Sequence, residues 1–297
     1  MPEQKLLVVS PVRNEADHFE QVARAMAAQT RPPDAWVVID DGSTDGTFEL
    51  AERLAAEIPF LLPRRAPAAP AAAPVKDRLA TAAAPRTFNA GLRSVDRTAF
   101  THIAKLDGDM ELPPGYWAAL LGEFERDPEL GVAGGLRTEL VRGRWKLEHI
   151  PLDHQVNGAL KCWSAACFHA IGGVEERLGW DTIDQTRARM LGFRTRSFPE
   201  LVAIHHRPWA SADGTLRGRA RYGEAAYIVQ FTLPWVLLRS VKVAASRPEG
   251  LSGAAFLYGY LRAAARRRER VADPQYRRFV RRELRARLAG LARLRTA

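Results

Sequence analysis

The sequence has few cysteines and no long apolar segment, and these absences exclude several classes of protein. Cys162 and Cys167 are the only cysteines among 297 residues. They are too few for a disulfide framework, and no Cys-x-x-Cys or Cys/His spacing indicates a zinc site. The first residues lead straight into a short apolar run, without the apolar core and cleavage site of a signal peptide. We therefore expect a reducing, cytoplasmic setting.

The excess of positive over negative charge lies at the C-terminal end of the sequence. The formal net charge is +10, and beyond residue 260 there are 13 arginines but three acidic residues. The tail therefore carries the whole excess, and the residues before it are neutral overall. Charge of this kind attracts nucleic acid or anionic lipid. The tail has few aromatic residues and no recognition module for nucleic acid, so we expect no nucleic-acid partner.

Short apolar runs alternate with helical patterns in the first half of the chain. Apolar runs at residues 6–9 and 36–39 precede helical patterns at 15–29 and 47–57. This rhythm is typical of βαβ units that feed a parallel sheet. The sequence therefore predicts an α/β fold with a mostly parallel, twisted sheet flanked by helices. Further elements are expected as a strand at 100–106, a helix at 114–127 and a strand at 131–135.

Two composition changes divide the chain. Residues 64–85 are rich in alanine and contain four prolines, which resist regular structure, and we interpret them as a flexible surface loop. Beyond about residue 208 the α/β rhythm gives way to helical patterns and the arginine-rich tail. We therefore predict one domain at 1–208 and a C-terminal helical segment at 209–297.

The C-terminal segment contains two apolar runs, at 231–238 and 254–261, and Pro234 interrupts the first. Neither reaches the ~18 apolar residues of a membrane-spanning helix. Trp235 and Tyr258 lie in these runs, and the arginine-rich tail follows them in the sequence. This combination favours an element that lies in the interface of an anionic membrane. The alternative is a helical subdomain that packs on the core and exposes a solvated basic face.

Acidic clusters follow two of the expected strands. The first is Asp40-Asp41-Gly42-Ser43-Thr44-Asp45-Gly46, and the second is Asp107-Gly108-Asp109. Ligands of open α/β sheets bind at the carboxyl ends of the strands, so these clusters should converge on one crevice. Two carboxylates separated by one small residue suit a hard divalent cation whose coordination is completed by phosphates.

The order of these motifs resembles that of family 2 glycosyltransferases. Ser10-Pro11-Val12-Arg13-Asn14-Glu15, the Asp40–Gly46 turn, Asn89-Ala90-Gly91 and Asp107-Gly108-Asp109 occur in the order and approximate spacing of that family, over roughly residues 5–205. The resemblance implies a glycosyltransferase-A fold in which 1–208 is the catalytic domain. It also implies a nucleotide-diphosphate sugar as donor, Mg²⁺ or Mn²⁺ as cofactor, and inversion at the anomeric carbon.

The resemblance also implies roles for particular residues. Asp109, Asp107 and His205 are the candidate metal ligands, with His205 placed after the last expected strand. The candidate nucleotide-sugar-binding residues are Pro11, Val12, Glu15, Asp40, Asp41, Arg86, Asn89, Asp107 and Trp180.

An inverting transfer needs one carboxylate that takes the proton of the acceptor hydroxyl. The family usually has a Glu-Asp pair at the start of a helix, and Asp181 matches its aspartate, so Asp181 is the candidate base. Trp180 replaces the usual glutamate and offers a face for stacking on a sugar. Asp184 is a rival base, and capping of the helix is the structural alternative for Asp181.

Other functions remain open at this stage. A sugar-phosphate nucleotidyltransferase shares carboxylates at strand ends, but it should have a glycine-rich basic loop where this chain has Ser10 to Glu15. A non-catalytic, membrane-associated protein that binds nucleotide sugars is the other alternative. No Gly-x-Gly-x-x-Gly motif indicates a nicotinamide dehydrogenase. For a glycosyltransferase on the cytoplasmic face of a membrane, we expect a lipid-linked or surface glycan as acceptor.

Overall fold

The computed structural model describes most of the chain. The described residues are 3–67, 82–141, 144–147, 154–207, 214–246 and 248–294. The strands are β1 (Leu6–Val12), β2 (Ala35–Asp40), β3 (Leu61–Arg65), β4 (His102–Leu106), β5 (Met110–Glu111), β6 (Leu130–Val141), β7 (Arg144–Leu147), β8 (Leu160–Ser164) and β9 (Arg194–His205). The helices are α1 (Ala16–Ala27), α2 (Thr47–Ala55), α3 (Ala83–Arg93), the 3₁₀ turn η1 (Arg97–Ala99), α4 (Tyr116–Arg126), α5 (Ala165–Ala170), α6 (Trp180–Met190), α7 (Thr215–Ile228), α8 (Leu233–Ala244), α9 (Leu251–Ala265) and α10 (Pro274–Leu294).

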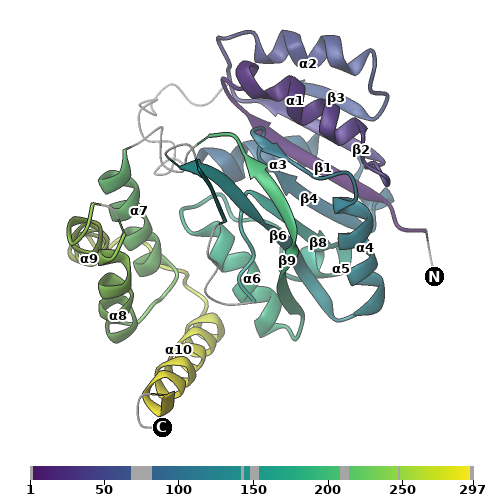
Figure 1. The fold of residues 1–297 in the computed structure, drawn as a ribbon. Coiled ribbons are helices and arrows are strands. Elements are labelled where there is room, and N and C mark those ends of the chain that lie inside the picture. The colour runs from purple at the N-terminus through teal and green to yellow at the C-terminus, as the bar shows by residue number, and fades with distance from the viewer. Residues whose placement is uncertain are drawn as a thin grey trace.

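The described strands form one mixed sheet with the order β3-β2-β1-β4-β8-β6-β9-β5, and β7 extends from β6. The pairs β1–β2, β2–β3 and β1–β4 are parallel, whereas β8 is antiparallel to both β4 and β6. Helices cover both faces of this sheet (Figure 1). The predicted α/β fold is confirmed, and the parallel pairs among β1 to β4 lie in the stretch in which strand and helix patterns alternate, while β6 and β9 form a further parallel pair.

Strands β1 and β2 are apolar throughout because both of their faces are covered. Leu6 and Val8 point to a core that they share with α1, α2 and α4. Leu7 and Val9 point to a second core on the other face, built with α3 and α5. A strand buried on both sides is a continuous apolar run, which is why these two strands could be recognised from the sequence.

Several expected boundaries are wrong. The interval 64–85 is not one loop, because β3 includes Arg64 and Arg65, and α3 starts at Ala83. Pro85 lies in the first turn of α3, where the N–H that proline lacks has no helical partner. Residues 68–81 of this interval lie outside the described residues. Likewise, Pro234 does not interrupt a helix but lies at the start of α8.

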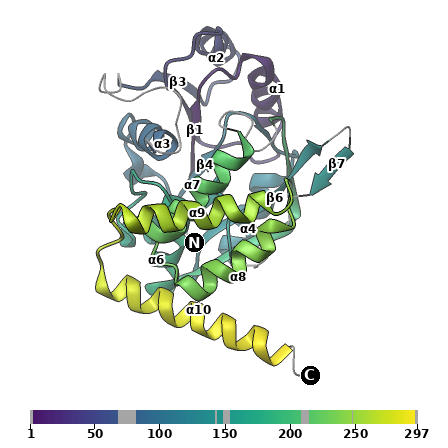
Figure 2. The same ribbon diagram turned by 90° about the vertical axis from the view of Figure 1, so that its left-hand side faces the viewer.

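The C-terminal helices α7, α8 and α9 lie beside α6 and away from β1–β3, as Figures 1 and 2 show. Helices α7 and α9 cross closely, because a methyl group on Gly223 or on Gly259 would lie 1.8 Å from a backbone oxygen of the other helix. No helix in the described part of the chain is long and apolar enough to cross a membrane.

The arginine-rich tail is for the most part a long helix, α10, and one side of it is buried. Tyr276, Val280 and Leu284 recur at every fourth position and pack against Ile183 of α6. Glu283 reinforces this contact through an ion pair of 2.8 Å with the Nε of Arg189. The exposed arginines lie on the side of α10 away from this apolar stripe. The inner side of α10 therefore packs on the core, as in the alternative of a helical subdomain with a solvated basic face. A division of the chain near residue 208 stays a prediction.

Candidate active site

The first acidic turn is held by its own side chains. The Asp40 carboxylate is buried at the end of β2 and accepts hydrogen bonds from the backbone N–H groups of Gly42 (3.2 Å) and Ser43 (3.1 Å). The N–H of Asp41 donates to the carbonyl of Val12 at 3.0 Å. Asp40 therefore shapes the turn, while Asp41 is fixed next to the end of β1.

Glu15 lies at the start of α1 and is only 8% exposed. Its Oε2 lies 2.7 Å from the Nη2 of Arg207, in the segment after β9. Burial raises the pKa of Glu15 to about 8, and the negative charges of Asp109 and Asp107 act in the same direction, although Arg207 opposes them. Several carboxylates are thus crowded around Glu15, which is the electrostatic environment that a bound cation would relieve.

The Asp107-Gly108-Asp109 turn lies against the end of β1, where Pro11 is half-buried and Val12 is buried. A methyl group on Gly108 would lie 2.6 Å from Cγ1 of Val12, so glycine permits this close contact. The Asp107 carboxylate forms an ion pair with Lys105, a buried residue of β4. The second acidic cluster therefore meets the N-terminal motif at one edge of the sheet.

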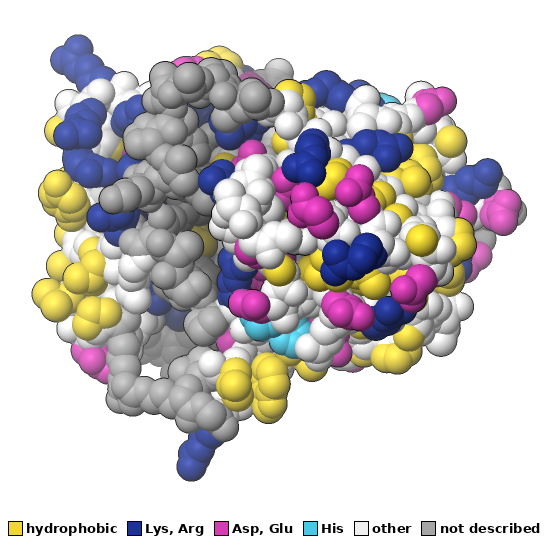
Figure 3. Space-filling model, turned by 90° about the horizontal axis from the view of Figure 1, so that it is seen from above, with side chains coloured by type: hydrophobic (Ala, Val, Ile, Leu, Met, Phe, Trp, Pro, Cys, Tyr) yellow, Lys and Arg dark blue, Asp and Glu magenta, His cyan; other side chains and the backbone are white. Residues whose placement is uncertain are grey.

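Asp109, in the turn between β4 and β5, and His205, at the end of β9, lie side by side. The Nε2 of His205 is 3.2 Å from Oδ2 of Asp109, and both residues are buried. Burial alone would lower the pKa of His205, but hydrogen bonds to Asp109 and Glu139 raise it to about 9. The neighbouring His206 bonds Glu111 at 2.8 Å, and Figure 3 shows histidine side chains beside acidic ones on this face of the molecule.

These side chains fit a divalent cation that also has phosphate ligands. Within the described residues, no group of three or more His, Cys, Asp or Glu side chains could hold a metal ion by itself. Mg²⁺ sites in phosphate-transfer enzymes commonly use one or two carboxylates plus the phosphates of the substrate. Asp109 and His205, with Asp107 two residues away, match such an incomplete site, and the charges of Asp109 and Asp107 add to the effect of burial on the pKa of Glu15.

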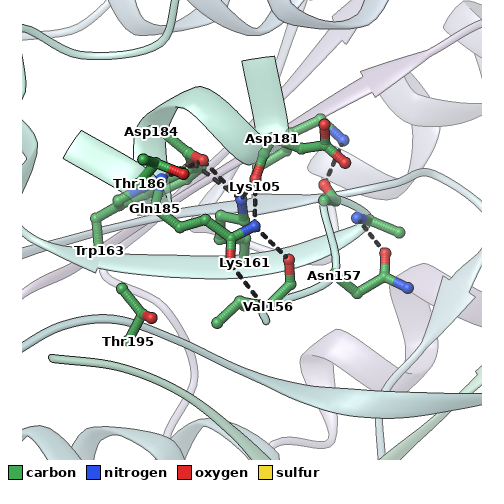
Figure 4. A network of polar contacts seen from close by, with 12 residues as sticks. Lys105, Val156, Asn157, Lys161, Trp163, Asp181, Asp184, Gln185, Thr186 and Thr195 are labelled. Carbon is green, nitrogen blue, oxygen red and sulfur yellow. Dashed lines mark hydrogen bonds and ion pairs between the residues drawn. The ribbon is translucent and has the colours of Figure 1, made fainter. Parts of the chain in front are cut away.

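Asp181 lies in the first turn of α6, close to Lys105 and Lys161 (Figure 4). A methyl group on Gly158 would lie 3.1 Å from Cβ of Asp181 and 3.2 Å from the Trp180 ring. The carbonyl of Gly158 accepts a hydrogen bond of 3.0 Å from the Nζ of Lys105, the lysine that pairs with Asp107. Gly158 and Lys105 thus connect the surroundings of the candidate base with those of the Asp107-Gly108-Asp109 turn.

Asp184, the rival base, is fully buried. Its carboxylate lies 3.0 Å from the Nζ of Lys161 and accepts a hydrogen bond of 3.1 Å from Nε1 of Trp163. Burial raises the pKa of Asp184 to about 6, against the opposing effect of Lys161. Lys161 also donates to the backbone carbonyl of Asp181 at 2.8 Å. Asp184 thus helps to anchor the first turn of α6, whereas Asp181 is half-buried.

The remaining predicted residues lie around this edge. Asn89 donates to the carbonyl of Val174 at 2.8 Å and to Glu176 at 3.2 Å, so its amide connects α3 to the segment before α6. Arg86 is half-buried in the first turn of α3. The Trp180 ring lies near two lysines that are paired across β4 and β8, 5.5 Å from Nζ of Lys105 and 5.2 Å from Nζ of Lys161. The sequence analysis did not single out these two lysines.

Residues 7–73 match the family model described as Glycosyl transferase family 2. Over 57 residues the chain is 49% identical to the succinoglycan biosynthesis protein ExoA of Rhizobium meliloti (strain 1021), a match that spans 19% of this chain and 17% of that relative. The fold is similar to that of the mannosyltransferase PcManGT from Pyrobaculum calidifontis in complex with GDP-Man and Mn²⁺. The TM-score is 0.56 at 17% identity, over 100% of this chain and 82% of that one. It is also similar to S. aureus TarS 1–349 in complex with UDP-GlcNAc, with a TM-score of 0.54 at 14% identity over 87% of this chain and 72% of that one.

The fold is therefore of the glycosyltransferase-A type. The sequence similarity to glycosyltransferase family 2 lies in residues 7–73, which form the first strands and helices of the sheet.

Proposed function

We propose that the chain transfers one sugar from a nucleotide-diphosphate sugar to a hydroxyl acceptor, with inversion at the anomeric carbon. The observation that carries this proposal is that the Asp109–His205 pair and Asp181 lie at the same edge of the sheet, connected through Lys105 and Gly158. A cation site beside a carboxylate on a separate helix is the arrangement that donor activation and acceptor deprotonation require.

On the donor side, Asp41, Glu15 and Asp107 surround the place proposed for the nucleoside, together with Pro11 and Val12. Asp109 and His205 would hold Mg²⁺ or Mn²⁺. When bound, the cation neutralises the charge that develops on the departing nucleotide diphosphate. The solved complexes of PcManGT with GDP-Man and Mn²⁺ and of TarS with UDP-GlcNAc support such a donor and cofactor. In this proposal Asp40 acts indirectly, by shaping the turn that presents Asp41.

On the acceptor side, the Asp181 carboxylate takes the proton of the attacking hydroxyl. The acceptor oxygen then forms a bond to the anomeric carbon as the bond to the nucleotide diphosphate breaks. Lys161 holds the backbone of Asp181 through its carbonyl, so the carboxylate is presented from a fixed helical turn. The half-buried ring of Trp180 next to it offers a face for a sugar. Asp184 is too deeply buried to meet an acceptor in this arrangement.

The acceptor is proposed to be a lipid-linked or surface glycan that the enzyme meets at the cytoplasmic face of a membrane. The likeness to a succinoglycan biosynthesis protein supports a role in polysaccharide synthesis. The apolar helical face, which we define as the exposed side chains of α8 and α9, supports contact with lipid. It consists of Leu233, Leu237, Leu238, Val241, Leu251, Tyr258 and Leu261. Exposed arginines of α10, among them Arg278, Arg281 and Arg285, supply charge that attracts anionic headgroups.

The test is a donor screen on the purified protein. UDP-, GDP-, dTDP- and CDP-sugars are incubated with Mn²⁺, Mg²⁺ or EDTA, and release of the nucleotide diphosphate is measured. We expect one nucleotide to be released in a metal-dependent reaction and the matching diphosphate to raise the melting temperature. Absence of both binding and turnover for all four nucleotides would refute the proposed function.

A further inference from the structure

Strands β6 and β7 form a hairpin at the margin of the sheet. Strand β7 pairs with β6, and within the described residues its other edge has no strand partner. Figure 2 shows β7 at the outer margin of the molecule, and all four of its residues are exposed. The hairpin is therefore a part of the surface that another molecule can reach.

Three large apolar side chains share one side of this hairpin. Leu140 lies opposite Trp145 in the β6–β7 register, and Thr138 lies opposite Leu147. Opposite residues of an antiparallel pair point to the same side, and so do residues two positions apart along a strand. Trp145 is 57% exposed, and Leu140 and Leu147 are 48% exposed each. We call Leu140, Trp145 and Leu147 the apolar hairpin face.

The apolar hairpin face lies on the same side of the sheet as α6. Arg137 of β6 is in register with Ala203 of β9, and Ala203 belongs to the core that is built with α1 and α4. Leu140 follows Arg137 by three residues and therefore points to the other side of the sheet. Ala188 of α6 packs in the core of that other side. The hairpin thus presents its apolar side chains on the side of the helix that carries Asp181.

Cations alternate with the apolar side chains of β7. Arg144 and Lys146 flank Trp145 in the sequence, and both are exposed. Tryptophan is enriched where a membrane meets water, and arginine and lysine near it are attracted by anionic headgroups. The same two cations oppose the pairing of β7 with the edge strand of a second copy, because charged side chains disfavour edge-to-edge pairing. An anionic membrane is therefore the partner that fits both kinds of side chain.

We propose that the apolar hairpin face enters the interface of an anionic membrane and turns the side of the sheet with Asp181 toward the lipid. The C-terminal helices lie on this side too, since a methyl group on Gly179, at the start of α6, would lie 2.7 Å from Cγ1 of Val229, just after α7. The hairpin is thus a second membrane contact besides the apolar helical face. This inference rests on the proposed function, because a lipid-linked acceptor then reaches Asp181 from the membrane.

The first test places a fluorescent reporter on the hairpin. Cys162 and Cys167 are buried, so a thiol-reactive nitrobenzoxadiazole dye labels an introduced cysteine selectively. Leu147→Cys carries the dye on the apolar hairpin face, and Ala118→Cys carries it at an exposed position of α4, which covers the other side of the sheet. Vesicles of phosphatidylcholine and phosphatidylglycerol are added to each labelled protein. We expect a blue shift and stronger emission from the dye at position 147 and no change at position 118.

The second test measures flotation with the same vesicles. Trp145→Glu should weaken binding about tenfold, because the indole ring is lost from the interface and a carboxylate is repelled by anionic headgroups. Arg144→Gln should weaken it about fivefold, and only when phosphatidylglycerol is present, because one cation near the headgroups is removed. Ala118→Glu adds a negative charge on α4 and is the control. Melting temperatures show whether the variants are folded, and R144Q serves if W145E is not.

A dye at position 147 that does not respond to lipid would overturn the proposal, even if the protein floats with the vesicles, since another surface would then make the contact. Flotation of W145E equal to that of the wild type would overturn it as well. A wild type that is dimeric, with W145E monomeric and no response to lipid, would assign the face to a second copy of the chain. Donor turnover judges the proposed function separately. If no donor is turned over but the dye at position 147 enters the membrane, the transferase proposal fails and the membrane contact stands.

Discussion

The ammonium group of Lys161 lies 3.0 Å from the carboxylate of Asp184, and neither side chain exposes more than 1% of its surface. Lys161 also donates to the carbonyl of Asp181, and Trp163 donates to Asp184. This buried pair connects β8 to the first turn of α6. The position of the proposed base thus depends on two charges that have no contact with solvent.

Replacing one partner of this pair should destabilise the protein strongly. Lys161→Met leaves the Asp184 carboxylate buried without its counter-charge, and breaking a buried pair in this way costs about 3–5 kcal/mol. Urea denaturation at pH 7 measures the loss. The double variant K161M/D184L removes both charges and should recover much of the stability. A K161M variant within about 1 kcal/mol of the wild type would show that the pair contributes little.

The two proposed roles of the acidic residues predict different defects. Asp181→Asn should lower kcat by about 10²- to 10⁴-fold, the usual contribution of a general base, while metal-dependent binding of the nucleotide diphosphate persists. Asp109→Asn should weaken that binding. Calorimetry with Mn²⁺ and the donor-turnover assay measure the two effects. Glu129→Gln, at an exposed surface carboxylate, is the control that should change neither. Loss of diphosphate binding in D181N would contradict its assignment as a base.

The acidic edge of the sheet could be predicted because strand ends are visible in the sequence. Buried parallel strands such as β2 and β4 are continuous apolar runs, and the residues after them must converge at the same edge of the sheet. Asp41, Asp107 and Asp109 followed from this rule. The sequence could not show that the Asp40 carboxylate accepts hydrogen bonds from the backbone of its own turn. An aspartate that is free to bind a ligand and one that is bonded to backbone N–H groups are the same letter in a sequence.

The interior charges were not predictable by the same reasoning. Lys105 and Lys161 lie within strands, and a single lysine in such a run is normally an exposed residue of an edge. Only the fold shows that each has a carboxylate and a carbonyl as partners. The packing of the C-terminal tail against α6 was not predicted, for a different reason. Thirteen arginines conceal the stripe of Tyr276, Val280 and Leu284, although its spacing of four residues is that of a packed helix.

Acid should destabilise the protein through His102. This histidine of β4 is buried against the ring of Phe124, at 4.8 Å, and burial lowers its pKa to about 4. The unfolded chain binds a proton below about pH 6.5, whereas the folded chain does so only near pH 4. This contribution is therefore fully present above pH 6.5 and decreases as the pH falls to 4, by up to about 3 kcal/mol. Denaturation at pH 7 and pH 4.5 should give a smaller difference for His102→Phe than for the wild type. An equal difference would exclude His102 as the cause.

Charge placed on the apolar helical face should release the protein from lipid. Val241 is 73% exposed on α8, and Val241→Glu adds a charge that is costly to bring into the membrane interface and is repelled by anionic headgroups. Flotation with phosphatidylglycerol vesicles should show weaker binding of V241E than of the wild type. Ala118→Glu introduces the same charge at an exposed position of α4 and is the control. If both variants lost vesicle binding equally, the change in net charge, and not the apolar helical face, would explain the loss.

Two glycines in the C-terminal helices should respond to alanine with opposite signs. A methyl group on Gly290 of α10 meets nothing within 4 Å, so Gly290→Ala should gain up to about 1 kcal/mol from helix propensity. A methyl group on Gly259 would lie 1.8 Å from the carbonyl oxygen of Ala220, so Gly259→Ala forces α7 and α9 apart and should cost about 1–3 kcal/mol. Urea denaturation of both variants measures these changes. Because Gly179, at the start of α6, packs on the C-terminal end of α7, a displaced α7 should also lower turnover in G259A. Stabilisation of both variants would mean that the two helices separate without cost.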